Sequence, residues 1–173
     1  MKETKLQEAN FIEYLESCKK LIVKVARIYC KDPEDRKDLI QDIVLQLWKS
    51  YPKYDKAFAI STWTYRIALN VSISFLRKAI TRLNTHKLYG QQVNWVHVDD
   101  VTTDPNLEHL YNFIGELKPI DKAIMILYLE GCKNKEISSV MGMSYTNIST
   151  RKERIKQRLK LYFETYKQQY NEI

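Results

Sequence analysis

Residues 131–160 read GCKNKEISSVMGMSYTNISTRKERIKQRLK, a pattern that predicts a helix, a tight turn and a second, longer helix. Asn134 is a suitable N-cap for the first helix, and Gly142 can adopt the left-handed conformation that ends it. Ser144 can cap the second helix. A helix-turn-helix is therefore expected near the C-terminal end of the chain.

The second of these helices has two different faces. Ile148, Ile155 and Leu159 share one side, whereas the opposite side is polar and cationic. In a helix-turn-helix the inner residues pack on the first helix, and outer Arg, Asn and Thr side chains reach base edges and phosphates. A merely solvated charged face is the alternative, but the polar start of the helix favours DNA binding. The candidate contacts are Thr146, Asn147, Thr150, Arg151, Arg154 and Arg158.

Composition sets limits on the class of protein. The chain has 173 residues, a net charge of +7 and a pI near 9.2, which favours a polyanionic partner. Its three cysteines, Cys18, Cys30 and Cys132, suggest neither a disulfide framework nor a zinc site. The N-terminus lacks the apolar core of a signal peptide, and no apolar run is long enough to span a bilayer. A soluble protein of the cytoplasm, without membrane insertion, is expected.

Three helices are expected in the first half of the chain. Helical spacing of apolar residues predicts the first over about 6–29. Asp32 and Pro33 start the second, which Pro52 should end after Tyr51. Ser61 can cap the third, expected over 62–80.

The second helix carries an apolar residue on a polar side. Ile40, Ile43 and Leu47 form its expected inner stripe, and Leu45 shares the far side with polar neighbours. A single exposed leucine is normal in a soluble protein, so the pattern alone assigns it no role. The far side comprises Asp38, Gln41, Asp42, Leu45 and Lys49.

The third helix is apolar around most of its circumference. Its polar residues fall on one narrow line, with Trp63 just ahead of it. Every helix leaves one edge in water, but a tryptophan together with arginines favours nucleic acid. The line consists of Arg66, Asn70, Ser74 and Arg77.

From Thr81 to Thr103 the periodicity disappears, and this segment is predicted to be a linker. Pro105 and Pro119 then start two further helices, the second of them closed by Gly131. The expected fold is all-α, with two small helical domains joined by a flexible linker: 1–80, the linker 81–104, and 105–173 with the helix-turn-helix. No nucleophile with a base, phosphate loop or metal-ligand pair is found, so neither catalysis nor a cofactor or metal is expected.

Three segments, in order and spacing, resemble regions 2.2, 2.3 to 2.4 and 4.2 of extracytoplasmic-function (ECF) sigma factors of the bacterial sigma-70 family. They are DLIQDIVLQLWKSYPKYD, STWTYRIALNVSISFLRK and YLEGCKNKEISSVMGMSYTNISTRKERIKQRLK. The resemblance covers nearly the whole chain apart from the linker. It implies a subunit of RNA polymerase that directs initiation at specific promoters.

The resemblance also implies roles for particular residues. Asp38, Gln41, Asp42 and Leu45 would bind the β′ clamp helices of core polymerase, and the C-terminal domain the β flap. Ser149, which stands where many relatives have Lys or Arg, would join the residues that read the -35 element. An anti-sigma factor is a further implied partner, and the linker, with Asp99 and Asp100, would thread towards the polymerase cleft. The implied -10 contacts are Trp63, Tyr65, Arg66, Asn70, Ser74 and Arg77.

Two other classes of protein remain compatible with the pattern. A conventional helix-turn-helix repressor or activator would bind duplex operators without polymerase, usually as a dimer. An adaptor or anti-sigma protein would leave the basic faces merely solvated.

Overall fold

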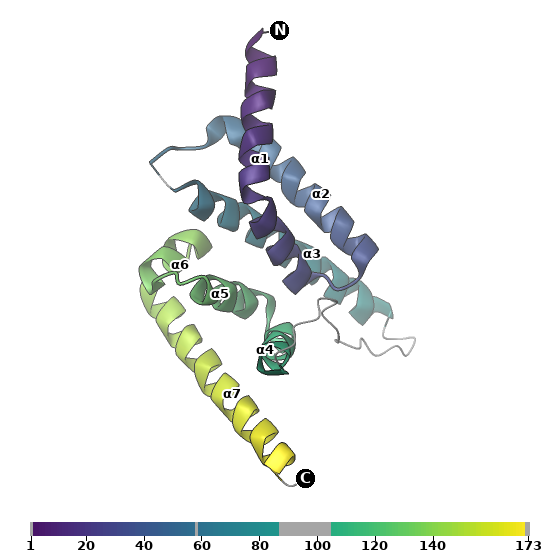
Figure 1. Cartoon of the computed structure of the whole chain (residues 1–173), viewed down its shortest axis with the longest axis vertical. Coiled ribbons are helices and arrows are strands. Elements are labelled where there is room, and N and C mark those ends of the chain that lie inside the picture. Colours follow the sequence, from purple (N-terminus) through teal and green to yellow (C-terminus); the bar gives the residue numbers. More distant parts are fainter. Residues whose placement is uncertain (1, 58, 87–104, 172–173) are drawn as a thin grey trace. The chain divides into compact units, whose positions relative to one another are not determined.

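The computed structural model describes residues 2–57, 59–86 and 105–171 and divides into two compact units, Met1–Asn94 and Trp95–Ile173 (Figure 1). In the described ranges the regular structure consists of α-helices and one short 3-10 turn, without a strand. This confirms the all-α prediction. The expected linker residues Asp99 and Asp100 lie outside the described ranges.

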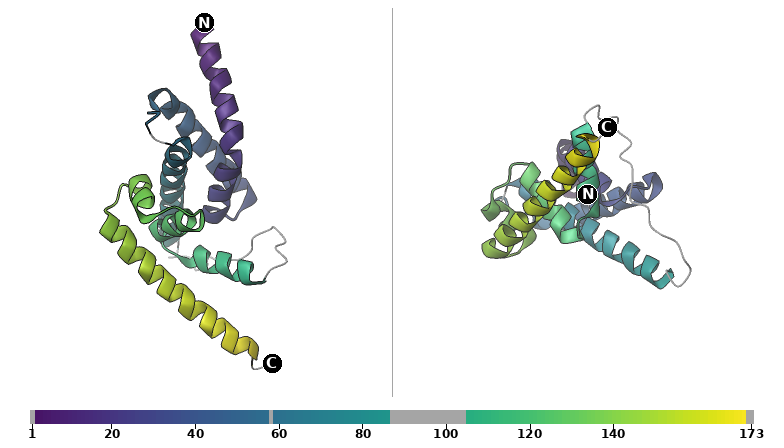
Figure 2. Two further views of the ribbon diagram at one scale, coloured as in Figure 1. Left: turned by 60° about the vertical axis from the view of Figure 1, so that its left-hand side comes forward. Right: turned by 90° about the horizontal axis from the view of Figure 1, so that it is seen from below.

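Where the structure describes it, the N-terminal unit contains three packed helices. Helix α1 spans Lys2–Tyr29, α2 spans Pro33–Ser50 and α3 spans Ile60–His86, while the 3-10 turn η1 spans Tyr51–Lys53. Each helix packs on the other two, and α2 and α3 run side by side (Figures 1 and 2). Their shared core buries Phe11, Tyr14, Ile22, Val25, Tyr29, Leu39, Ile43, Leu47, Ala68, Leu69, Ile73 and Leu76.

The start of α2 confirms the expected cap. The Asp32 carboxylate accepts hydrogen bonds from the backbone N–H groups of Glu34 and Asp35, both at 2.9 Å, and Pro33 occupies the first turn. These bonds satisfy donors that have no partner inside the helix. On the inner stripe Ile43 and Leu47 are fully buried as predicted, whereas Leu39 is fully buried in place of Ile40, which is only half-buried.

Both ends of α3 differ from the prediction. The helix α3 begins at Ile60, so Ser61 lies within its first turn rather than at the cap, and it continues to His86, six residues past Ile80. The end of α2 agrees with the prediction, because the helix ends at Ser50 with Tyr51 as its C-cap, and Pro52 follows within η1. A proline is tolerated there because its missing N–H has no partner to lose.

The described part of the C-terminal unit contains four helices: α4 (Pro105–Glu116), α5 (Pro119–Leu129), α6 (Asn134–Met141) and α7 (Tyr145–Asn171). Helices α5, α6 and α7 pack on one another, and α4 packs on α5. Gly131 and Gly142 have positive φ values of 81° and 62°, the left-handed conformation that allows the chain to turn after α5 and α6. The predicted helix-turn-helix is α6 and α7, and its core buries Ile124, Met125, Ile126, Leu127, Ile137, Val140, Ile148 and Ile155.

The cap of α6 differs from the prediction. Asn134 is the first residue of the helix rather than its N-cap, and the backbone N–H of Lys133 donates to the Glu136 carboxylate at 2.6 Å. The Asn134 side chain instead accepts a hydrogen bond from Lys152 Nζ at 2.6 Å. The predicted cap of α7 is confirmed, because Ser144 Oγ accepts from the backbone N–H of Asn147 at 3.3 Å.

Candidate nucleic-acid and protein interfaces

One line of α3 is open to solvent along its length. Arg66, Asn70, Ser74 and Arg77 are all exposed, at spacings of four, four and three residues that keep them on one side of the helix. The intervening Ala68, Leu69, Ser72, Ile73 and Leu76 are buried. The helix therefore offers a narrow polar line with two fixed positive charges.

Tyr65 does not belong to this exposed line. It retains only 8% exposure, because it precedes Arg66 by one residue and so lies about 100° around the helix, on the core side. Its neighbour Thr64 is completely buried. The ring of Tyr65 is thus part of the core, which separates it from the other residues expected to contact the -10 element.

Aromatic rings fix the position of Trp63 at the head of the line. The Trp63 ring is half-buried, with its centroid 5.1 Å from that of Tyr54 and 5.8 Å from that of Tyr14. Tyr14 stacks on Tyr51 at 5.3 Å, and Phe11 lies 4.9 Å from Trp48. These contacts join α1, the end of α2, the following loop and the start of α3 into one aromatic cluster.

A buried hydrogen bond lies beneath this cluster. Thr64 Oγ1 donates to the Ile60 carbonyl at 2.7 Å, so its lone pairs accept from the Tyr14 hydroxyl at 2.8 Å. Burial raises the pKa of Tyr14 well above its ordinary value, because the phenolate would lose its hydration. The phenol therefore remains a neutral donor that ties α1 to the first turn of α3.

The predicted protein-binding residues share one side of α2. Asp38, Gln41, Asp42 and Leu45 are all exposed, and Leu45 retains 49% exposure. Their spacing of three, one and three residues places them along one helix face. An apolar side chain thus lies open beside two carboxylates.

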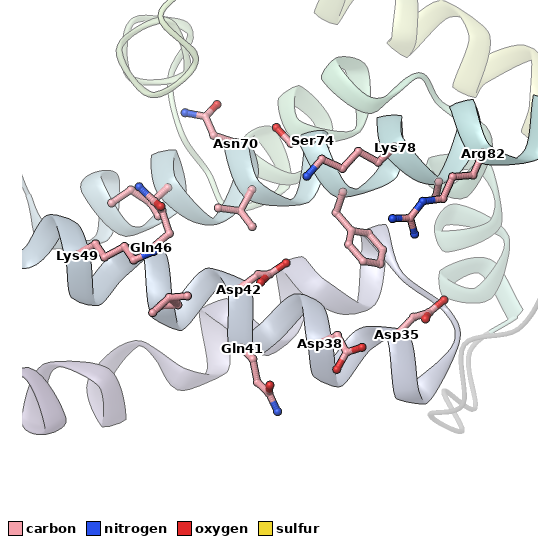
Figure 3. Close-up of a pocket in the computed structure, with 15 residues that line it drawn as sticks. Asp35, Asp38, Gln41, Asp42, Gln46, Lys49, Asn70, Ser74, Lys78 and Arg82 are labelled. Atoms are coloured by element: carbon pink, nitrogen blue, oxygen red, sulfur yellow. The ribbon is translucent and has the colours of Figure 1, made fainter.

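A groove of about 1040 Å³ separates this face of α2 from α3 (Figure 3). All four α2 residues line it, together with Asn70 and Ser74 from the polar line of α3, whereas Trp63, Arg66 and Arg77 do not. The groove thus brings together part of the predicted polymerase surface and part of the predicted DNA surface.

The two walls of this groove differ in charge. Asp35, Asp38 and Asp42 line the α2 wall with one cation, Lys49, whereas Lys78 and Arg82 line the α3 wall. Asp35, Lys78 and Arg82 were not among the predicted site residues. Their spacing could have revealed them, because Asp35 lies one turn before Asp38, and Lys78 and Arg82 follow Ser74 at intervals of four.

On α7 the predicted DNA-contacting residues fall into two groups. Thr146, Asn147, Thr150, Arg154 and Arg158 are exposed, whereas Ser149 and Arg151 are half-buried. No carboxylate of the described residues pairs with Arg154. Its guanidinium is therefore available to an external acceptor.

Arg151 is tied into the fold. Its Nη1 donates to Asp121 Oδ1 at 2.8 Å, and its Nε donates to Asn147 Oδ1 at 3.0 Å. The carboxylate retains 14% side-chain exposure and the guanidinium 36%, so solvent screens the pair only partly. Arg151 therefore links the first turn of α5 to α7 and orients the amide of Asn147.

Two further cations of α7 lie against the body of the unit. Lys152 Nζ donates to Asn134 and lies 5.0 Å above the ring of Tyr128. The guanidinium carbon of Arg158 lies 6.0 Å from the ring centre of Phe113. Much of the positive charge of α7 is thus directed along its flanks rather than outward.

The cysteines have the environment of structural residues. Burial raises the pKa of the Cys30 thiol to about 11, and it also raises the pKa of Cys18 and Cys132. Such thiols are poor nucleophiles near neutral pH. The described part of the chain contains no cluster of metal-ligating side chains, and none of its helices is long and apolar enough to cross a membrane.

Comparison with protein families assigns both units. Residues 14–81 match the model of sigma-70 region 2, and residues 107–159 match that of sigma-70 region 4. The chain belongs to the sigma-70 family. This sigma factor resembles the ECF group, with region 2 in α1–α3 and region 4 in α4–α7.

A curated relative and two solved structures agree with this assignment. The RNA polymerase sigma factor SigV of Bacillus subtilis (strain 168) is 25% identical over 154 residues, which cover 87% of this chain and 89% of SigV. The sigma factor RpoE of Bartonella quintana, solved with the anti-sigma factor NepR, gives a TM-score of 0.73 at 17% identity, covering 90% of this chain and 97% of that one. CnrH, solved with the cytosolic domain of CnrY, gives 0.64 at 17% identity, covering 91% and 90%.

Proposed function

We propose that this ECF sigma factor uses three faces, two of which meet at the groove between α2 and α3, to direct RNA polymerase to promoters. The first is the line Arg66, Asn70, Ser74 and Arg77, which would bind the melted -10 element. The amide of Asn70 can hydrogen-bond a base edge, and the two arginines can neutralise phosphates. Trp63, held by its aromatic neighbours, offers a stacking surface at one end. The observation that carries this proposal is an exposed polar line on a helix whose other residues from Thr64 to Leu76 are buried or half-buried.

The second face is the outer side of α7, which would read the -35 element as duplex DNA. Thr146, Asn147, Thr150 and Arg154 are exposed and follow the expected geometry of a recognition helix. Arg151 would act through its bonds to Asp121 and Asn147, as a positioning residue. Ser149 and Arg158 would contact the DNA backbone from the flanks.

The third face is the α2 wall of the groove, which would bind core polymerase. An exposed leucine beside carboxylates offers both an apolar anchor and charges that select a basic partner surface. Asp38, Gln41, Asp42 and Leu45 would contact the β′ clamp helices, and the region 4 unit would contact the β flap.

The domains follow from these roles: residues 1–80 for region 2, 81–104 as linker and 105–173 for region 4. The helix α3 continues to His86, so we place the end of the first domain a turn or more beyond residue 80. We also propose a non-enzymatic role in the cytoplasm. An anti-sigma factor is a proposed further partner, because RpoE of Bartonella quintana was solved with one.

The experiment that tests the proposal is run-off transcription by core polymerase with three variants. Leu45→Ser should weaken binding to core polymerase. Asn70→Ala should leave core binding intact and impair opening at the -10 element. Arg154→Ala should change preference at the -35 element alone. Loss of core binding in Asn70→Ala, or unchanged promoter preference in Arg154→Ala, would show that the faces are wrongly assigned.

A conventional helix-turn-helix regulator is not favoured. Such a protein needs only the α6–α7 unit, whereas residues 14–81 of this chain match region 2. Tight operator binding by the free protein would support the regulator instead.

A further inference from the structure

Four side chains of α7 face directly away from the body of the region 4 unit. They are Thr146, Thr150, Glu153 and Gln157, all of them exposed. Each lies two residues from a fully buried isoleucine, either Ile148 or Ile155. Because two residues turn an α-helix by roughly 200°, these four side chains point opposite to the core. They form the central line of the outer face.

The centre of this line carries a negative charge. Arg151 is bonded to Asp121, and Arg158 lies against Phe113, so both lean towards the flanks. The partner that the described residues offer Glu153 is Lys156, at 3.9 Å, with 60% and 47% side-chain exposure. An exposed pair at that distance is weak, so the carboxylate is free to take another partner.

A carboxylate can only accept hydrogen bonds, and DNA phosphates repel it. In the major groove, guanine presents two acceptors and thymine one acceptor with a methyl group. Adenine presents an amino donor beside its N7 acceptor. A carboxylate that accepts from the amino group would therefore bring its second oxygen against N7, and two acceptors repel each other. Cytosine presents an amino donor without that neighbouring acceptor. Cytosine is thus the base that a glutamate at this position fits best.

We propose that Glu153 is a specificity-determining residue that accepts a hydrogen bond from the N4 amino group of a cytosine in the -35 element. The inference rests on the proposed function of α7 as the helix that reads this element. Opposite guanine or thymine the carboxylate is left without a donor, and opposite adenine one of its oxygens faces the N7 acceptor, in a region of strong negative potential. Glu153 therefore selects mainly by penalising wrong bases, while Arg154 beside it attracts the duplex.

The test is polymerase-dependent transcription from a promoter library with a randomised -35 element. The full chain is compared with Glu153→Gln, Glu153→Ala and the control Glu164→Gln. Glu164 is an exposed glutamate of the same helix that pairs with Lys160 at 3.8 Å, and it lies three turns further along. The control therefore removes the same charge from the same helix.

The unsubstituted chain should prefer cytosine at one position of one strand by roughly 5- to 100-fold. Glu153→Gln should move this preference to adenine, because an amide can bond N6 and N7 together. Glu153→Ala should flatten that position alone, and Glu164→Gln should change nothing. An unchanged cytosine preference in both Glu153 variants, or an equal change at every position, would overturn the inference. Absence of any polymerase-dependent start by the unsubstituted chain would instead overturn the proposed function.

Discussion

Arg151 Nη1 donates a hydrogen bond to Asp121 Oδ1 at 2.8 Å, across thirty residues of sequence. Asp121 lies in the first turn of α5, so the bond holds α7 against the start of another helix. Its second donor, Nε, reaches Asn147 at the start of α7. The arginine therefore holds α7 against α5 and orients the amide of Asn147.

This relationship predicts that Arg151 and Asp121 act as one unit. Arg151→Ala and Asp121→Ala should each destabilise the region 4 unit by about 1 kcal/mol, and the double variant should cost little more than either. Hydrogen exchange at α7 backbone amides measures the change, and Arg154→Ala serves as a control with unchanged protection. Fully additive effects would contradict the coupling.

Removing the Tyr14 hydroxyl should weaken the region 2 unit. Tyr14→Phe keeps the ring contacts but leaves Thr64 Oγ1 with one fewer bond, so we expect a loss of about 1 kcal/mol. Urea unfolding followed by tryptophan fluorescence measures this, because Trp48 and Trp63 belong to the same aromatic cluster. An unchanged unfolding midpoint would show that the hydrogen bond adds nothing.

Leu45→Ser should separate binding from stability. The side chain is exposed, so the free energy of unfolding should change by no more than about 0.5 kcal/mol. Affinity for core polymerase should fall roughly 10- to 100-fold if the leucine is buried at that interface. Leu161→Ser, at a similarly exposed leucine of α7, provides the control in a binding assay. Equal affinities of the two variants would exclude Leu45 from the interface.

Cys30 should resist alkylation in the folded protein. Its pKa of about 11 lies above the ordinary thiol value, so the thiolate is scarce at pH 8 and the side chain is buried. Because the Cys30 thiol ionises at a lower pH in the unfolded chain than in the folded one, the free energy of unfolding should be unaffected below about pH 9. It should fall between about pH 9 and 11, where only the unfolded thiol is ionised. Mass spectrometry after iodoacetamide treatment should show slow labelling of Cys30, and fast labelling once urea unfolds the chain. Rapid labelling of the folded protein would contradict this environment.

Local signals predicted the helices well. Asp32 with Pro33 and the glycines at 131 and 142 act through their own backbone chemistry, so their effects are readable without a tertiary structure. The prediction that Asn134 caps α6 was wrong, because its side chain instead accepts a hydrogen bond from Lys152, eighteen residues away. The prediction that Ser61 caps α3 was also wrong, because the helix already begins at Ile60.

The candidate faces were predicted less completely. Helical periodicity predicted the exposed line of Arg66, Asn70 and Ser74. Tyr65 was added to the expected -10 contacts through the family resemblance alone, and packing buries it. Arg151 lies at the edge of the polar face of α7, and its partner Asp121 comes from another helix. The pairing of α2 with α3 into one groove likewise depends on tertiary packing, which sequence spacing does not contain.

The most direct test of the central claim is to add the purified chain to core polymerase on a random-sequence promoter library and to sequence the 5′ ends of the transcripts. A sigma factor with these three faces should yield starts that depend on both the chain and the polymerase, preceded by two conserved elements at a fixed spacing. Transcript ends that are the same with and without the chain would contradict the account.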